Sequence, residues 1–456
     1  MLKQVRALSV GGLAALGPRF LPFADAAGGD APLSRLLRLS LFQVSVGMAL
    51  VLLVGALNRV MIVELGVPAS IVGAMISLPL LFAPFRALIG FRSDRHVSAL
   101  GWRRAPFIWR GAMLQFGGFA IMPFALLVLS GYAEAATLPP WIGIAGAAVA
   151  FALVGAGAHV VQTVGLALAT DLTPPERQPN VVGLMYVMLL VGMIASSLLF
   201  GALLSDYTPG RLIRVVQGAA VLTLILNVVA IWKQEPRDRG RARAHRPDGD
   251  FGDAWRAFIA GEGARARLVV LALGAMGFGM ADVLLEPYGG QALGMSVAAT
   301  TKLTATFAGG GLVGFALASR VLSRAGASPM RLALLGAVAG GLAFAAIMLA
   351  APAQSVPLFV AGAALVGFGA GLFGHGALTA TMRAAPKDQA GLALGAWGAV
   401  QATAAGLAIA LGGILRDAFA GVFGGEGAYM AVFALEIAFL VAALVAARAL
   451  ARAPGV

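Results

Sequence analysis

The chain has 456 residues, of which 60% are hydrophobic and only 12% charged, and its mean hydropathy is +0.89. This balance excludes an ordinary soluble domain and indicates a protein whose main solvent is lipid. The absence of cysteine excludes disulfides, thiolate catalysis and cysteine-ligated metal sites. The formal net charge of +13 would suit a nucleic-acid binder, but the basic residues fall in alternate loops, so no nucleic-acid partner is predicted.

Apolar stretches of about 20 residues, the length that crosses a hydrocarbon core about 30 Å thick, recur along the chain. Runs such as Met48–Gly55 are continuously apolar rather than alternating, which favours helices over barrel strands. The predicted fold class is therefore an all-α membrane protein with twelve transmembrane helices. The expected spans are residues 40–63, 68–90, 106–130, 141–169, 180–204, 211–232, 267–287, 298–320, 330–351, 356–382, 389–414 and 427–449.

Lysine and arginine residues gather in particular loops. They precede the first span, separate the second from the third, the sixth from the seventh and the eighth from the ninth, and follow the last. The third-to-fourth and ninth-to-tenth loops hold no cation in this reading. By the positive-inside rule, both termini are expected in the cytoplasm of a bacterial inner membrane.

The long polar stretch at residues 233–266 divides the chain into two six-helix halves. Aligning the halves brings Gly155, Gly157, Pro174 and Gly183 onto Gly367, Gly369, Pro386 and Gly395, which favours repeats related about the membrane normal. The linker acts either as a tether or as a dock for anionic lipid or an acidic partner. The expected units are a cytoplasmic amphipathic segment at 1–39, helical halves at 40–232 and 267–450, the cytoplasmic linker at 233–266, and a cytoplasmic tail at 451–456.

Ionisable side chains inside a bilayer are costly, so each one is a candidate functional group. Asn58, Arg59 and Glu64 lie late in the first span, and Asp282 and Glu286 lie late in the seventh, one helical turn apart. These residues are predicted to form an intramembrane charge network or gate towards the periplasmic side. An ion pair of Arg59 with Asp282 or Glu286 is expected, serving either structure alone or ligand binding and ion coupling.

Two histidines, His159 and His375, fall at similar depths in the fourth and tenth spans. A neutral imidazole at such a place makes a helix–helix hydrogen bond, relays a proton, or ligates the magnesium of a chlorin. Both are therefore candidate pigment ligands. No residue spacing supports a permanent metal site or a catalytic triad, so neither a metal nor an enzyme activity is predicted.

The loop after the second span reads Gly90-Phe-Arg-Ser-Asp94-Arg95 and continues, after an insert, as Gly101-Trp-Arg103-Arg104. It resembles the cytoplasmic signature of the major facilitator superfamily, in which an acidic-to-basic contact between helix ends acts as a conformational gate. The resemblance implies that superfamily's fold and a cytoplasmic gate formed by these residues. The alternative is that the charges only set the topology.

Longer phrases of the chain resemble the PucC/LhaA family over nearly its whole length from Leu33. They are Leu41-Phe-Gln-Val-Ser-Val-Gly-Met48, Leu57-Asn-Arg-Val-Met-Ile-Val-Glu-Leu-Gly-Val-Pro68, Arg86-Ala-Leu-Ile-Gly-Phe-Arg-Ser-Asp94, Ala99-Leu-Gly-Trp-Arg-Arg104 and Gly279-Met-Ala-Asp-Val-Leu-Leu-Glu-Pro-Tyr-Gly-Gly290. The N-terminal phrase from Gly17 to Asp25 favours the core-antenna branch, LhaA.

This resemblance implies an assembly factor for light-harvesting antenna complexes in the photosynthetic membrane of purple bacteria, one that binds bacteriochlorophyll or delivers it to antenna polypeptides. The implied partners are antenna polypeptides, transiently held bacteriochlorophyll and membrane lipid, and a homo-oligomer is left open. The alternative function is a proton-coupled secondary transporter of a small or amphipathic molecule, with Arg59, Glu64, Asp282 and Glu286 as coupling groups. A prenyltransferase of pigment synthesis is not predicted, because no Asp-rich diphosphate motif is present.

Overall fold

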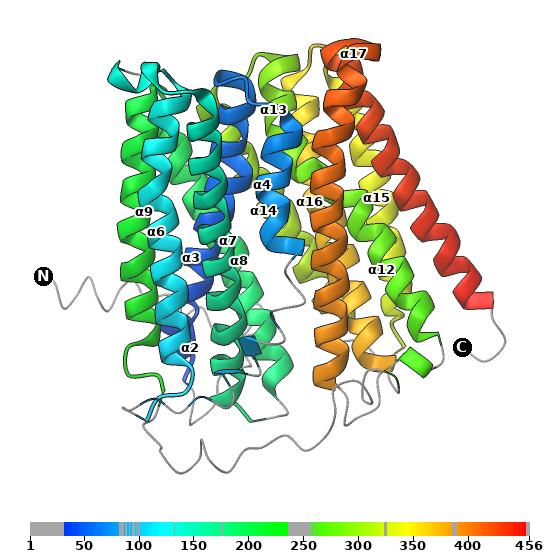
Figure 1. The fold of residues 1–456 in the computed structure, drawn as a ribbon. Coiled ribbons are helices and arrows are strands. Elements are labelled where there is room, and N and C mark those ends of the chain that lie inside the picture. The colour runs from blue at the N-terminus through cyan, green and yellow to red at the C-terminus, as the bar shows by residue number, and fades with distance from the viewer. Residues whose placement is uncertain are drawn as a thin grey trace, which may run out of the picture.

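The structure is a computed structural model, and it shows a bundle of long helices that run side by side (Figure 1). It describes residues 32–81, 86, 89–90, 92–93, 96, 98, 101–131, 133–174, 177–235, 256, 259–261, 263–322, 326–384 and 390–452. All the regular elements in these ranges are helical. The all-α fold class expected from hydropathy is therefore confirmed.

The bundle has two groups of helices, shown blue to green and green to red in Figure 1. The N-terminal half contains α2 (Leu33–Leu39), α3 (Leu41–Leu50), η2 (Val51–Leu57), η3 (Val60–Glu64), α4 (Ala69–Leu81), α6 (Ala105–Leu129), η4 (Ala133–Thr137), α7 (Pro140–Asp171), α8 (Gln178–Leu203) and α9 (Pro209–Ile231). The C-terminal half contains α12 (Ala264–Gly279), α13 (Ala281–Leu293), α14 (Val297–Leu322), α15 (Pro329–Ala350), α16 (Val356–Ala384) and α17 (Ala390–Arg452).

Ten helices in the described ranges are long and apolar enough to cross a membrane, which makes this a multi-pass membrane protein. A shorter apolar helix, Ala69–Leu80, falls within the second expected span. The eleventh and twelfth expected spans both fall in α17, where Gly424 has φ +76° and interrupts the helical backbone. This left-handed conformation favours glycine. The exact number of twelve crossings stays a prediction.

The first membrane helix begins earlier than its predicted start at Ser40. Residues 33–39 form α2, which packs against α7 and α9 with Leu36 and Leu39 fully buried, so this part of the expected surface segment belongs to the bundle. Beyond Leu50 the helix widens into the π-helical segments η2 and η3. Such widened turns often mark functional sites. Most of the expected linker, residues 236–255, lies outside the described residues.

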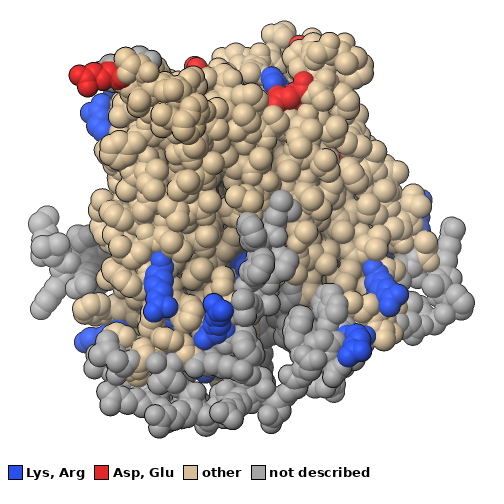
Figure 2. Space-filling view, viewed as in Figure 1, with Lys and Arg blue, Asp and Glu red and all other residues tan. Residues whose placement is uncertain are grey.

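Charged side chains gather towards the two ends of the bundle. Most visible Lys and Arg side chains lie near the lower end in Figure 2, and the visible Asp and Glu side chains lie near the upper end. We call the end where α6 begins and α7 finishes the basic end, and the opposite end, where η3 and α13 finish, the acidic end. The described chain starts in α2 and stops in α17 at the basic end.

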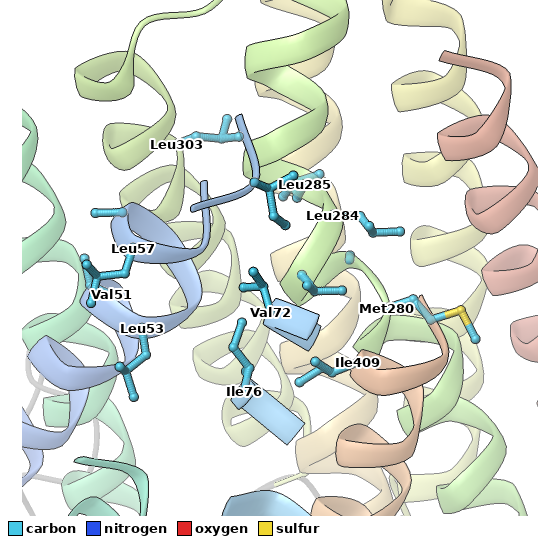
Figure 3. Close-up of a cluster of buried hydrophobic side chains, with 14 of the residues drawn as sticks. Val51, Leu53, Leu57, Val72, Ile76, Met280, Leu284, Leu285, Leu303 and Ile409 are labelled. Atoms are coloured by element: carbon cyan, nitrogen blue, oxygen red, sulfur yellow. The ribbon is translucent and has the colours of Figure 1, made fainter. Parts of the chain in front are cut away.

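Apolar side chains from both halves pack together between η2, α4, α13, α14 and α17 (Figure 3). Leu57, Val72, Leu284 and Ile409 are all at most 1% exposed there. Small residues let the backbones approach: an added Cβ at Gly73 would lie 2.9 Å from the carbonyl oxygen of Ile409. The two halves are therefore in close contact on the acidic side of the bundle.

Candidate functional site

A cavity with two adjoining lobes lies where helices of both halves meet. The acidic lobe, of about 280 Å³, contains Asp282 and Glu286 in its wall. The imidazole lobe, of about 260 Å³, contains Tyr186, His375 and Trp397. The lobes share the lining residues Phe307, Ala370, Gly374 and Gln401, so they adjoin. An apolar cavity with few convergent polar groups is the usual form of a ligand site.

In the acidic lobe, Glu286 of α13 is only 5% exposed. Its Oε1 accepts a hydrogen bond from the Thr304 hydroxyl of α14, and its Oε2 has no hydrogen-bond partner in the described part of the chain. Gly55 makes room for this carboxyl, since an added Cβ would lie 2.7 Å from Oε1. Asp282, one turn earlier, also lines the lobe. Two predicted carboxyl groups therefore face one apolar space.

The helix that carries these carboxyl groups is interrupted between α12 and α13, at Met280. The Ala281 N–H donates to Oε1 of the fully buried Glu436, at 2.7 Å, and the Asn58 side-chain amide donates to the Val283 carbonyl at 3.0 Å. Inside a membrane, backbone N–H and C=O groups that lack their helical hydrogen bonds need side chains as partners. Glu436 of α17 was missed by sequence reasoning, although a lone carboxylate within the last expected span was the signal available.

Arg59 does not form the predicted ion pair with Asp282 or Glu286, and that prediction was wrong. Its Nη1 pairs with Oε1 of Glu64 at 2.5 Å, and its Nη2 donates to the Met295 carbonyl at 3.0 Å. The wide π turn of η3 carries Glu64 back over Arg59, where the glutamate side chain keeps 36% of its surface exposed. An ion pair with a carboxylate that remains partly hydrated requires less desolvation than an ion pair in which both groups are buried.

Further contacts join the halves at the acidic end. The guanidinium of Arg59 lies against Gly290 of α13, where an added Cβ would be 2.9 Å from Nη2. The N–H of Ser70, in α4, donates to Asp417 Oδ2 of α17 at 2.7 Å. Tyr207, in the loop between α8 and α9, has its pKa raised to about 12 by burial and then by the charge of Glu64. It therefore stays neutral beside the Arg59–Glu64 pair at neutral pH.

In the imidazole lobe, the His375 ring of α16 lies 4.3 Å, centroid to centroid, from the Phe315 ring of α14. Among the described residues, neither the buried Nδ1 atom of His375 nor the buried indole Nε1 of Trp397 has a hydrogen-bond partner. Such orphaned polar atoms are uncommon in a well-packed interior. They leave one imidazole nitrogen and one indole N–H free for a ligand.

The second predicted histidine, His159, is not among the residues that line either lobe. It lies on the face of α7 that also carries Gln162 and Thr163, three and four residues later. Both of these side chains accept hydrogen bonds from Arg86. The structure therefore places the two histidines in different surroundings.

At the basic end, Arg103 and Arg104 of the predicted gate motif both bind Asp171 of α7, at 2.5 and 3.0 Å. Glu235 accepts from the backbone N–H groups of Arg103, Arg104 and Ala105, so its carboxylate stabilises the start of α6.

The remaining motif residues are placed only in part. Gly101 has φ +81°, a conformation that favours glycine, and the Gly90 carbonyl accepts from Ser93, which in turn accepts from Arg104. Asp94 and Arg95 lie outside the described residues. Ser93, Asp171 and Glu235 were missed by sequence reasoning, because their roles depend on which helix ends meet.

Solved structures similar to this one are transporters. A POT family transporter in complex with a thioalcohol conjugated peptide has a TM-score of 0.67 at 12% identity, covering 94% of this chain and 100% of that one. A bacterial homolog of the human lysosomal transporter Spinster, in an inward-facing and unoccupied conformation, has a TM-score of 0.63 at 17% identity, covering 91% and 95%. At such identities the likeness shows the fold alone, which is that of the major facilitator superfamily.

Relatives at the sequence level are far more similar. Protein PucC of Rhodovulum sulfidophilum is 68% identical over 420 residues, which are 91% of this chain and 92% of the relative. Protein PucC of Cereibacter sphaeroides is 63% identical over 433 residues, 94% of each. The "Bacteriochlorophyll synthase 44.5 kDa chain" of Rhodobacter capsulatus is 29% identical over 437 residues, 92% of this chain and 98% of the relative.

These names do not support the finer expectation of an LhaA branch, since both highly similar relatives are called PucC. A family model described as "PUCC protein" matches residues 56–454. That match covers most of both halves of the bundle, including most of the residues that line the cavity. The chain belongs to the PUCC protein family.

Proposed function

We propose that this membrane protein is a non-enzymatic assembly factor for light-harvesting antenna complexes and holds bacteriochlorophyll transiently in the cavity between its halves. The observation that carries the proposal is the buried, unpartnered Nδ1 of His375 in an apolar lobe. Family membership and the naming of one relative as a bacteriochlorophyll synthase chain support it. The setting is the photosynthetic inner membrane, with both termini, and so the basic end, in the cytoplasm.

The chemistry of the imidazole lobe fits a chlorin. A neutral imidazole nitrogen is a suitable ligand for the central magnesium, and the free Trp397 N–H can donate to a carbonyl at the edge of the macrocycle. The apolar side chains of the lobe, including Phe307 and Phe315, can pack against the two faces of the pigment macrocycle. Each lobe falls just below the range of about 300–1,000 Å³ typical of ligand cavities, and the two together fall within it. His159 is the second candidate ligand.

The contacts at the acidic end act, in this proposal, as the gate of the periplasmic side. Arg59 links η3 to the Met295 carbonyl, and Asp417 links α17 to the start of α4. Both contacts cross between the halves. Closure at the acidic end leaves two routes by which a ligand can enter the cavity: from the basic end, or laterally from the lipid. Antenna polypeptides also lie in the lipid. A homo-oligomer is compatible with this arrangement and is not required by it.

A second candidate function is a proton-coupled transporter of a small or amphipathic molecule. The observation that favours it is the free Oε2 of Glu286 in the cavity wall. A carboxyl group buried in an apolar wall can exchange a proton as a ligand enters or leaves. Fold alone does not separate the two functions, since the same scaffold serves many activities.

Purification from a phototrophic host in mild detergent tests the proposed function. An absorption spectrum and a protein-composition analysis of the same sample are expected to show bacteriochlorophyll and antenna polypeptides together. A sample containing neither would overturn the proposal. Proton uptake that depends on Glu286 and on an added solute, in vesicles free of pigment, would establish transport instead.

A further inference from the structure

Asp282 and Glu286 line the acidic lobe from one face of α13, and no described residue forms an ion pair with either of them. Arg59, the cation that was predicted to pair with them, is held by Glu64 and by the Met295 carbonyl instead. Carboxyl groups inside a membrane bundle usually pair with a cation or face a cavity that brings their partner. These two groups face a cavity.

Glu286 presents one free oxygen to this lobe. Its side chain is only 5% exposed, its Oε1 accepts a hydrogen bond from the Thr304 hydroxyl, and its Oε2 accepts none from any described residue. An added Cβ at Gly55 would lie 2.7 Å from Oε1 and 3.2 Å from the Thr304 hydroxyl oxygen, so the backbone of η2 holds the carboxyl in place. A buried acceptor that is fixed but lacks a donor is costly. It therefore points to a ligand that donates.

Asp282 supplies a second acceptor one helical turn before Glu286. Residues four apart on a helix lie about 5–6 Å from each other on the same face. The side chain of Asp282 lines the same lobe, and no described residue makes a hydrogen bond to it. Two carboxyl groups at this spacing suit a donor that carries several N–H groups and a positive charge, as an ammonium does.

The walls around the two carboxyl groups are apolar and partly aromatic. Phe278 of α12 and Phe373 of α16 both line the lobe, with ring centroids 5.9 Å apart, and Phe307 of α14 lines it as well. Gly274 has no side chain and leaves room for the Phe373 ring, which an added Cβ would overlap. Aromatic rings pack against apolar bodies and attract cations to their faces.

The size of the lobe favours an organic cation over a metal ion. Its volume of about 280 Å³ would be mostly empty around a bare ion. The described residues also contain no group of three or more His, Asp or Glu side chains that could hold a metal. An amine on a small apolar body would fill the lobe and place its charge at the carboxyl groups.

We infer that the acidic lobe is a binding site for a small apolar amine in its ammonium form. The ammonium donates to Glu286 Oε2 and to Asp282, and the apolar body packs among the three phenylalanine rings. This site goes beyond the proposed function and does not rest on pigment binding. It names the class of molecule that the second candidate function would carry.

Calorimetric titration of the full-length protein tests the inference. The protein is purified in a non-ionic detergent from a host that makes no bacteriochlorophyll, and a mildly alkaline buffer favours the ionised carboxyl groups. The probes are phenylbutylammonium and phenylbutanol, which share one apolar body and differ in charge. The variants are Glu286→Gln, Asp282→Asn and the double change. Glu134→Gln is the matched control, because Glu134 is exposed in η4.

The native protein is expected to bind the ammonium at least about tenfold more tightly than the alcohol. Each single variant lowers the affinity for the ammonium and leaves that for the alcohol unchanged, and the double variant loses the preference. Glu286→Gln keeps an oxygen for the Thr304 hydroxyl, so its fold should be retained. Glu134→Gln keeps the full preference.

Equal affinities of the native protein for the two probes would overturn the inference without any variant. So would a double variant that melts like the native protein and keeps the full preference for the ammonium. Ammonium binding by a protein that fails to bind bacteriochlorophyll would support this site while contradicting the proposed function. Bacteriochlorophyll binding without a preference for the ammonium would overturn this site alone.

Discussion

At the scale of single residues, the partners of Arg59 and Glu286 follow the cost of desolvation. Arg59 pairs with the half-exposed Glu64 and not with the buried Glu286. Glu286 takes a neutral donor, the Thr304 hydroxyl. His375 and Trp397 each keep a buried polar atom that no described residue contacts by a hydrogen bond. These orphaned atoms are the strongest sign that the cavity accepts a ligand.

Arg59 and Glu64 are predicted to be energetically coupled. In a double-mutant cycle with Arg59→Gln and Glu64→Gln, measured by thermal unfolding in detergent, each single change is expected to destabilise the protein. The double change costs less than the sum, because the pair is lost only once. The cycle of Arg59→Gln with Glu235→Gln, at the opposite end of the bundle, is the control and should be close to additive. Additivity in the cycle of Arg59 with Glu64 would contradict the pairing.

A side chain at Gly290 is predicted to displace the Arg59 guanidinium from its contacts with Glu64 and the Met295 carbonyl. Gly290→Ala places a Cβ about 2.9 Å from Nη2 of Arg59. Overpacking of this kind costs about 1–3 kcal/mol and should lower the melting temperature. Gly341→Ala is the matched control, because an added Cβ at Gly341 of α15 meets nothing within 4 Å. Equal melting temperatures for the two variants would show that Arg59 does not lie on Gly290.

At the scale of elements, the helix pair α12–α13 and the start of α6 depend on carboxylates from distant parts of the chain. Glu436 binds the Ala281 N–H at the interruption, and Glu235 binds three N–H groups at the first turn of α6. Each carboxylate supplies the acceptor that a free helix N-terminus lacks. The two cases differ in burial, since Glu436 is fully buried and Glu235 is half-buried.

Glu436→Leu is expected to destabilise the protein by about 1–3 kcal/mol, because the buried Ala281 N–H loses its acceptor. Glu436→Gln keeps a carbonyl oxygen at the same place and should remain close to the native melting temperature. Hydrogen exchange across α12 and α13 checks whether the loss is local. Faster exchange at α13 in both variants would mean that the negative charge, rather than the acceptor, holds the interruption.

Glu235→Ala is expected to lower stability by about 1–2 kcal/mol through the loss of a charged acceptor at the α6 N-terminus. Glu134→Ala is the control, because Glu134 lies exposed in η4. The measurement is again thermal unfolding in detergent. A larger shift for Glu134→Ala than for Glu235→Ala would contradict the capping role of Glu235.

At the scale of the whole molecule, hydropathy predicted most spans because continuous apolar length is a local property of the sequence. The predicted start of the first span, at residue 40, is later than the start of the helix. The basic residues Arg35 and Arg38, which alternate with the buried Leu36 and Leu39, lower the local hydropathy there. The partner of Arg59 could not be predicted, since it depends on the π turn of η3. His375 lines the cavity and His159 does not, because the two helices are rotated differently about their axes. The sequence shows the depth of each histidine in the membrane but not this rotation.

In the proposed function, the two-lobed cavity holds a pigment between the two halves of the molecule. The acidic lobe supplies carboxyl groups and the imidazole lobe supplies one free nitrogen. The contacts of Arg59 and Asp417 hold the halves together at one end. On this account the superfamily fold serves to carry a ligand to a membrane partner.

The most direct test is a titration of the purified protein with bacteriochlorophyll, followed by the absorption change that axial ligation of the magnesium produces. The native protein and His159→Leu are expected to show ligated pigment, and His375→Leu is expected to lose the ligation signal and bind at least about tenfold more weakly. Unchanged ligation in His375→Leu, with a native melting temperature, would contradict the assignment of the cavity as the pigment site.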